Sequence, residues 1–262
     1  MKVLLRRSWS SSTRAFSPLM PPRARKPVGI VLADKPAGPS SFALVSALRR
    51  QTGARTGHAG TLDPFATGLL VLLSGAATSL APCFVGLDKR YETTVDLTAT
   101  SSTGDPEGEL GERHDAPSPE ELEVSVALLR GEVELPVPAF SAIKIDGERA
   151  YKKARRGEDV AVPMRRSHVY GLDVLGYDGA IATLRLHVSS GTYVRSIAEA
   201  LGGHCVTLRR TAVGPFAISE VSERMVPASI AIGRLPEEAV ERIPRELIDR
   251  VLAVEAEEYL SA

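Results

Sequence analysis

The sequence predicts an α+β fold with a central mixed, mostly antiparallel β-sheet flanked by helices. Two segments, 91–98 and 182–188, alternate apolar and polar residues, a period typical of strands with one buried face. Helical patterns lie between the strands, but the spacings are hairpin-sized, which favours antiparallel pairing over regular βαβ winding. No internal repeat is evident in the sequence.

Length and composition are those of a folded protein. The chain has 262 residues, 44% hydrophobic and 24% charged, which predicts a sizeable core and excludes global disorder. No apolar run approaches the roughly 18 residues needed to cross a bilayer. Cys83 and Cys205 lie far apart without CxxC spacing, which excludes a disulfide scaffold and a cysteine-based zinc site. We therefore expect a soluble protein of a reducing compartment, the cytoplasm.

The first residues differ from the rest of the chain. Residues 1–33 hold seven basic and no acidic side chains, whereas the remainder holds 25 basic and 32 acidic ones. We interpret residues 1–26 as a disordered basic leader; the alternatives are an organelle transit peptide and a translation start at Met20. Bulk charge gives no argument for a nucleic-acid partner, which would need a local basic face.

Local signals predict the remaining elements. Proline and glycine mark a turn at 34–39, and Ser40 and Ser41 are candidate N-caps of the following helix. A glycine-rich loop at 53–60 precedes a buried strand. The predicted elements are a strand at 28–33, a helix at 42–50, a strand at 69–73, and helices at about 118–129, 151–156 and 194–201.

Charge is segregated along the chain. Residues 101–134 hold ten acidic and two basic side chains, and we expect them to form an exposed loop followed by the helix at 118–129. Residues 144–166, here called the basic segment, hold eight basic and four acidic ones. We predict one folded domain at 27–219 and a short, helical, acidic C-terminal extension at 220–262.

The most informative string is Gly-His-Ala-Gly-Thr-Leu-Asp-Pro at 57–64. Its glycines permit a sharp turn and a close approach of the backbone to a ligand. Pro64 stiffens the loop and biases Asp63 toward an extended conformation. A carboxylate on a stiff loop suits a nucleophile or a general base, although an Asp-Pro pair is also common in ordinary turns.

This string and the residues that follow it, 65–70, resemble the catalytic loop of the TruB family of tRNA pseudouridine synthases. The resemblance covers about 28 to 216 and implies the pseudouridine-synthase fold for 27–219. It also implies isomerisation of uridine to pseudouridine in the T-loop of tRNA, at position 55, by base flipping and without a metal or cofactor. Further segments that resemble family motifs, in family order, are 34–41, 88–91, 138–144, 151–157, 190–195 and 208–210.

The resemblance also implies catalytic roles. Asp63 matches the nucleophile, which attacks either the base or the sugar, and Arg195 matches the arginine that pairs with it. We expect Arg195 to keep this carboxylate ionised and oriented. Tyr91 matches the aromatic residue that lies against the flipped uracil. Without the resemblance, Tyr91 would be read as a core residue and Arg195 as a surface ion pair.

Seven further residues are candidates for binding the RNA. His58 matches the family residue that fills the space left by the flipped base, and Tyr193 and Leu208 match walls of the pocket. Lys35 contacts phosphate or supports the loop, and the basic segment is expected to grip phosphates. The plainer alternatives are structural hydrogen bonding, core packing and solvated surface charge. The candidates in the basic segment are Lys152, Arg155 and Arg156.

The end of the chain departs from many family members. The 46 residues after Phe216 are acidic and lack strand alternation, so we expect no C-terminal PUA domain and a weaker contact with the tRNA acceptor arm. Two alternative functions are an RNA chaperone of the same fold and a guide-RNA-dependent synthase. The intact set of Asp63, Tyr91 and Arg195 favours an active tRNA synthase, which we expect to be a monomer.

Overall fold

The computed structural model describes residues 26–141, 143–145, 147–158 and 161–260, so nearly all of the predicted leader lies outside the described residues. The elements in chain order are β1 (Gly29–Lys35), α1 (Ser41–Thr52), β2 (Thr56–His58), β3 (Thr67–Ser74), the 3₁₀ helix η1 (Gly75–Leu80), α2 (Ala81–Val85), β4 (Lys89–Asp96), α3 (Pro119–Leu128), β5 (Gly131–Pro136), β6 (Lys144–Ile145), β7 (Glu148–Arg149), α4 (Ala150–Arg155), β8 (Met164–Tyr177), β9 (Ile181–Val188), α5 (Val194–Ala200), β10 (His204–Val213), β11 (Phe216–Ala217), the 3₁₀ helix η2 (Ile218–Glu220), β12 (Val226–Pro227), α6 (Ala228–Gly233), α7 (Glu237–Val240) and α8 (Arg245–Leu260).

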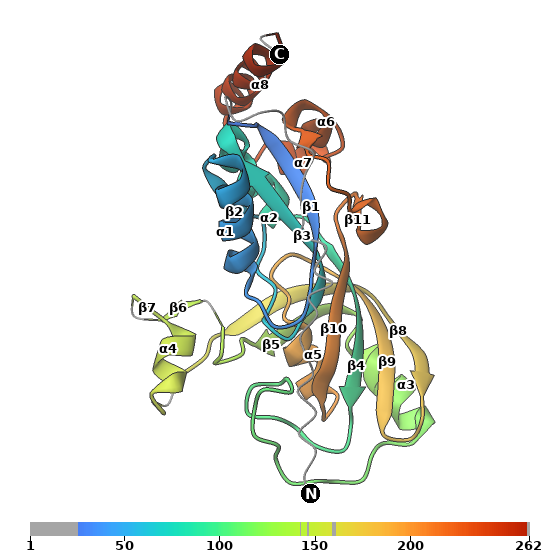
Figure 1. Ribbon diagram of the computed structural model, residues 1–262. Coiled ribbons are helices and arrows are strands. Elements are labelled where there is room, and N and C mark those ends of the chain that lie inside the picture. Colours follow the sequence, from blue (N-terminus) through green and yellow to red (C-terminus); the bar gives the residue numbers. More distant parts are fainter. Residues whose placement is uncertain (1–25, 142, 146, 159–160, 261–262) are drawn as a thin grey trace, which may run out of the picture.

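One long sheet runs through the molecule, in the strand order β12-β1-β3-β10-β4-β9-β8-β5, with β2 beside β3 and β11 beside β10 (Figure 1). The pairings in this sheet are antiparallel except for the short contact between β3 and β10, which is parallel. The predicted α+β class, with a mixed and mostly antiparallel sheet flanked by helices, is confirmed.

The parallel contact between β3 and β10 depends on Gly68. This residue has a φ of +103°, and a Cβ atom built on it would lie 2.3 Å from the carbonyl oxygen of Arg210. Only glycine permits so close an approach of two backbones at this φ. The contact brings the segment before β3 next to β10, and this junction becomes the centre of the candidate site.

Helices cover the sheet at three places, and each forms a hydrophobic cluster. Apolar residues of β1 and β3 pack against α2, α6 and α8 on one face and against α1 on the other. Farther along the sheet, β4, β8, β9 and β10 pack against α3 and α5. Figure 1 shows α4, β6 and β7 projecting away from these layers.

Residues 220–262, predicted as a helical extension, contribute to the first of these clusters. Ala228, Ile248 and Val251 are buried there, and both carboxylate oxygens of Glu255 accept backbone N–H groups at the start of α6. Two residues of this region form β12, which pairs with β1 and was not expected from the sequence. The described part of 220–262 is therefore packed onto the sheet.

Most predicted elements are present close to their expected bounds. Ser40 caps α1 with its side chain, and Ser118 caps α3 in a capping box with Glu121. Of the longer strands, β5, β8 and β10 were missed, as were the short strands β2, β6, β7, β11 and β12. Both β8 and β10 contain register shifts of the kind a β-bulge produces, which break the alternation of buried and exposed residues that predicts a strand.

Candidate active site

Residues 59–66, here called the Asp63 loop, connect β2 to β3 and are held by side chains from three other elements. The hydroxyl of Ser41, the first residue of α1, accepts the backbone N–H of Leu62 at 2.9 Å and lies 3.0 Å from the Leu62 carbonyl oxygen as its donor. The N–H of Ala66 donates to the carbonyl of Asp63 at 3.1 Å, which closes a tight turn. The carboxylate therefore sits on a rigid support.

Lys35, at the end of β1, supports the part of the Asp63 loop that follows Asp63. Its ammonium group donates to the carbonyl oxygens of Pro36, Pro64 and Ala66 at 3.0, 3.1 and 2.6 Å. The side chain is fully buried, and burial lowers its pKa to about 8, although the Asp63 carboxylate acts in the opposite direction. These contacts leave no donor for an RNA phosphate, so they favour the loop-supporting alternative for Lys35.

Arg210, on β10, supports the part of the same loop that precedes Asp63. It is 1% exposed, and its guanidinium donates to the carbonyl oxygens of Leu69 at 2.7 Å, Gly60 at 3.1 Å and Thr61 at 3.4 Å. A buried guanidinium with several carbonyl partners satisfies groups that could not reach water. Arg210 and Lys35 thus hold the loop on both sides of Asp63.

The expected contact between Asp63 and Arg195 is present. Oδ2 of Asp63 lies 3.0 Å from Nε of Arg195, in α5, although the Nε–H is not directed along a hydrogen bond. Arg195 is buried and also contacts Asp105 at 3.3 Å and the carbonyl of Thr103 at 2.8 Å. Asp105 was missed, because its acid-rich segment was predicted to be exposed, whereas its own side chain is buried.

Burial and the nearby cations act in opposite directions on the pKa of Asp63. Burial raises the pKa of this carboxyl group above its usual range, and the nearby Asp105 carboxylate acts in the same direction. Arg195 and Lys35 oppose the shift without cancelling it. The effect of Arg195 has the expected direction: this cation favours the ionised carboxylate and limits a shift that burial would otherwise make larger.

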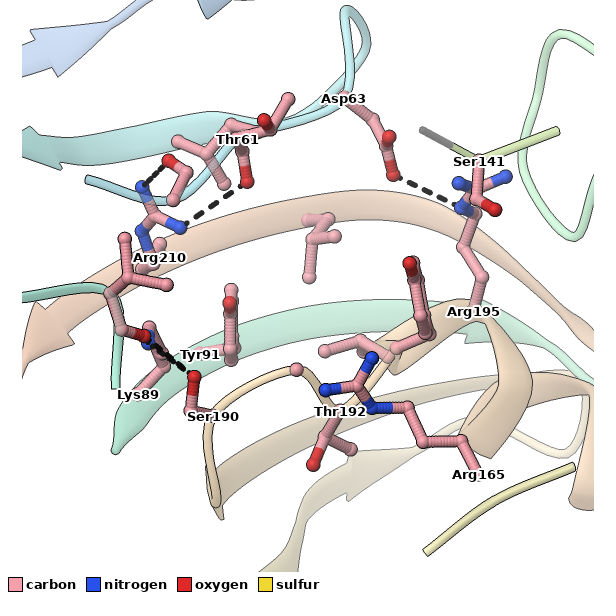
Figure 2. A pocket seen from close by; sticks show the side chains of 17 residues that line it. Thr61, Asp63, Lys89, Tyr91, Ser141, Arg165, Ser190, Thr192, Arg195 and Arg210 are labelled. Atoms are coloured by element: carbon pink, nitrogen blue, oxygen red, sulfur yellow. Dashed lines mark hydrogen bonds and ion pairs between the residues drawn. The ribbon is translucent and has the colours of Figure 1, made fainter. Parts of the chain in front are cut away.

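A cleft of about 290 Å³ opens beside the Asp63–Arg195 pair. Tyr91, Tyr193 and Leu208 line it, as the resemblance implies, and their side chains come from β4, the start of α5 and β10. Figure 2 shows the ion pair at one side of the cleft and Arg210 and Lys89 at the other. The cleft therefore has a carboxylate, apolar and aromatic walls, and cations around it.

The other predicted RNA-binding residues lie outside this cleft. His58, on β2, is half-buried; burial lowers its pKa, and its buried Nδ1 has no hydrogen-bond partner among the described residues. Lys152 and Arg156 lie exposed in or beside α4, and Arg156 makes a two-pronged contact of 2.8 Å with Glu148. Arg155 ends α4, and its side chain lies outside the described residues.

The sequence reading also missed several residues that line the cleft. Lys89 is buried and ties β4 to the loop before α5, donating to the carbonyl of Val85 at 2.6 Å and the hydroxyl of Ser190 at 3.3 Å. Burial lowers the pKa of Lys89 to about 7. Ser141 is buried, and its hydroxyl has no partner among the described residues. The sequence signal that could have identified Lys89 and Ser141 is that they belong to segments that resemble family motifs, 88–91 and 138–144.

Within the described residues, no three His, Cys, Asp or Glu side chains are grouped to hold a metal ion. None of the described helices combines the length and the apolar character needed to span a membrane.

Comparison with known proteins places this site in a family. Residues 48–194 match the model described as TruB family pseudouridylate synthase (N terminal domain). The chain is 44% identical over 209 residues to tRNA pseudouridine synthase B of Ralstonia pickettii, covering 75% of this chain and 65% of that protein. It is 42% identical over 211 residues to the protein of the same name in Thermobifida fusca, covering 74% and 72%.

A solved structure agrees with the sequence relatives. A chain in the crystal structure of a Cbf5-Nop10-Gar1 complex superposes with a TM-score of 0.56 and 27% identity, covering 72% of this chain and 50% of that chain. The family model spans more than half of this chain, and the second relative is covered over more than two thirds of its length. The chain therefore belongs to the TruB family of pseudouridylate synthases.

Proposed function

We propose that this protein isomerises uridine to pseudouridine at position 55 in the T-loop of tRNA, with Asp63 as the nucleophile and without a cofactor. The observation that carries the proposal is the Asp63–Arg195 pair beside a cleft walled by Tyr91 and Leu208. The relatives named tRNA pseudouridine synthase B support the tRNA substrate.

The reaction is an internal rearrangement. The bond between N1 of uracil and C1′ of ribose breaks, the uracil turns, and a bond forms between C5 and C1′. C5 loses a proton and N1 gains one, so no atom, electron or group has to be supplied from outside. The protein needs to provide a nucleophile, a cavity that retains the free base and a path for one proton.

The side chains around the cleft suit these tasks. Asp63, on its fixed loop, bonds covalently to the nucleotide, and this bond breaks again before the product leaves, so that the carboxylate is restored; Arg195 sets the orientation of the carboxylate. Tyr91 packs against the uracil and retains it while it turns. Because a stacked base cannot reach such a recessed carboxylate, the uridine has to leave the RNA stack, and His58 supports the RNA in that form.

The same proposal extends to the partner and to the organisation of the chain. The T-arm of tRNA is the RNA partner, the protein acts as a cytoplasmic monomer, and residues 27–219 carry the catalytic machinery. Lys152 and the other cations of the basic segment contribute salt-dependent attraction to phosphates. In this view any RNA-chaperone activity is secondary, because a chaperone would not need a carboxylate on a loop that buried side chains hold rigid.

The experiment is tritium release from unmodified tRNA that carries C5-labelled uridine, with mapping of the modified position. The wild type should release tritium from T-loop uridine 55, and a tRNA with cytidine at that position should release none. Asp63→Asn should reduce the rate by roughly 10⁴-fold or more, as expected for loss of a nucleophile, while tRNA binding persists.

Asp173→Asn is the matched control, since Asp173 is an exposed carboxylate on β8 that pairs with Arg130 and Arg185. This variant should keep the wild-type rate. Substantial turnover by Asp63→Asn would remove Asp63 from its proposed role. Tight tRNA binding without any tritium release by the wild type would favour the chaperone alternative.

A further inference from the structure

Arg165, at the start of β8, lines the cleft with a charged group that has no partner in the described part of the chain. Lys89 and Arg210 donate mainly to backbone carbonyls, and Arg195 is bound by Asp63 and its other partners. Arg165 lines the same cleft and is exposed, and within the described part of the chain it makes no hydrogen bond or ion pair. Its five N–H donors are therefore available to a ligand.

The backbone of the cleft is shaped to let Arg165 in. Gly191, in the loop before α5, has a φ of +83°, and a Cβ atom built on it would lie 2.2 Å from Nη2 of Arg165 and 2.6 Å from Cζ. The guanidinium group thus lies directly against the glycine backbone, where any other residue would displace it. Figure 2 shows the Arg165 side chain running toward the centre of the cleft near Thr192.

The chemistry of a nucleotide explains why such a group is needed. When a uridine enters the cleft, its uracil lies deep, near Tyr91 and Asp63, whereas its two flanking phosphates remain nearer the solvent. A guanidinium group presents a planar set of donors that matches a phosphate geometrically, and it keeps its charge at any physiological pH. The buried cations are less suited to this role, because their donors already have partners: Arg210 and Arg195 contact the Asp63 loop, and Lys89 donates to Val85 and Ser190.

We propose that Arg165 binds one of the two phosphates flanking the target uridine and thereby holds the flipped nucleotide in the cleft. This inference rests on the proposed function and names a substrate contact for it. Gly191 makes the contact possible by leaving room for the guanidinium group.

The first test is the kinetics of Arg165→Gln on an unmodified T-arm stem-loop. A charge-assisted contact of this kind is worth enough to reduce kcat/KM roughly 10- to 100-fold, mainly through KM. The slope of log Kd against log salt should fall by about 1. Arg165→Lys should reduce kcat/KM less than Arg165→Gln does, because lysine keeps the positive charge although it lacks the planar set of donors. Arg185 is an exposed arginine on β9 that pairs with Asp173 of β8. The control variant Arg185→Gln should leave all these values unchanged.

The second test removes the charge from the RNA instead. Stem-loops are made with a neutral methylphosphonate in place of the phosphate on the 5′ or the 3′ side of the target uridine. With one of them the wild type should lose about as much kcat/KM as Arg165→Gln loses with normal RNA, and the variant should lose little more.

Equal losses for wild type and variant with both modified RNAs would overturn the assignment, as would an unchanged KM in Arg165→Gln. Either result leaves the proposed function intact, provided that the wild type still converts normal RNA. Failure of the wild type to release tritium from any tRNA would instead overturn the proposed function itself.

Discussion

The cations around the Asp63 loop and the cations in or beside α4 look alike in the sequence but have opposite surroundings. Lys35, Lys89 and Arg210 are buried, and their donors point to carbonyl oxygens of the protein. Lys152 and Arg156 lie on a projecting element and are exposed (Figure 1). The first group builds the shape of the site, whereas the second can act on RNA only through charge at the surface.

This difference teaches that a positive charge near a nucleotide site is not by itself a phosphate contact. A buried ammonium or guanidinium group is costly unless its donors are satisfied, and those of Lys35 and Arg210 are satisfied largely by the loop that carries Asp63. The hydrogen bonds that offset the cost of burying Lys35 and Arg210 also make the Asp63 loop stiff. Arg165, near the end of the basic segment, differs from both groups: it lines the cleft and remains unpaired among the described residues.

Among substitutions of these cations, the largest effect should come from Arg210→Met, in the first group. The substitution leaves the carbonyls of Gly60, Thr61 and Leu69 without their donor, and should lower the free energy of unfolding by about 3 kcal/mol. Because the part of the Asp63 loop that precedes Asp63 is then no longer held, kcat should fall by roughly 100-fold or more. Urea denaturation and single-turnover tritium release measure the two effects.

The neighbouring residue provides the matched control. Arg209 is partly exposed and forms an ion pair of 2.7 Å with Asp34, so Arg209→Met should cost at most about 1 kcal/mol and leave kcat near the wild-type value. If Arg209→Met and Arg210→Met cost the same, the contrast between buried and exposed cations would have no energetic meaning.

An intermediate effect is expected in the pH dependence of the chemical step. Asp63 acts in its ionised form, and its pKa is raised, so activity should be lost as pH falls through a value above that of an ordinary aspartate. Arg195 lowers this pKa, so Arg195→Gln should move the acid limb of the single-turnover profile to higher pH. Thermal unfolding of each variant checks that it remains folded.

Arg195→Lys sharpens the same test. It keeps a positive charge, so its acid limb should stay closer to that of the wild type, while its rate falls because an ammonium group cannot replace the planar fork. An acid limb that does not move in Arg195→Gln would show that Arg195 has no electrostatic influence on Asp63.

Local patterns in the sequence predicted much of the fold, and their failures have a physical cause. The strands β4 and β9 alternate regularly between buried and less buried residues, and the helices α1 and α3 begin at side-chain caps; both signals depend only on near neighbours. The bulged strands β8 and β10 do not, because an extra residue shifts the alternation. Arg210 adds to the difficulty, since a charged residue at a fully buried position contradicts the hydrophobic pattern of a strand.

The candidate site was predicted in part, and only through the resemblance. Asp63 and Arg195 are far apart in the chain, and nothing in their local sequence requires them to meet. Asp105 was missed because a single buried carboxylate does not stand out in an acid-rich segment. The role of Lys35 as a loop support depends on three carbonyls whose direction only the folded backbone determines.

The smallest effect is expected for Lys152→Glu, which tests the second group. Lys152 is exposed on α4, so reversing its charge should weaken tRNA binding only about 3- to 10-fold at low salt, and less at physiological salt because of screening. Single-turnover rates at saturating enzyme should not change, because the Asp63 loop is held by the buried cations. Arg245→Glu, an equally exposed reversal on α8, is the control for net charge and should bind like the wild type. If Lys152→Glu slowed the chemical step instead, the basic segment would belong with the residues that shape the site, and the contrast between the two groups would fail.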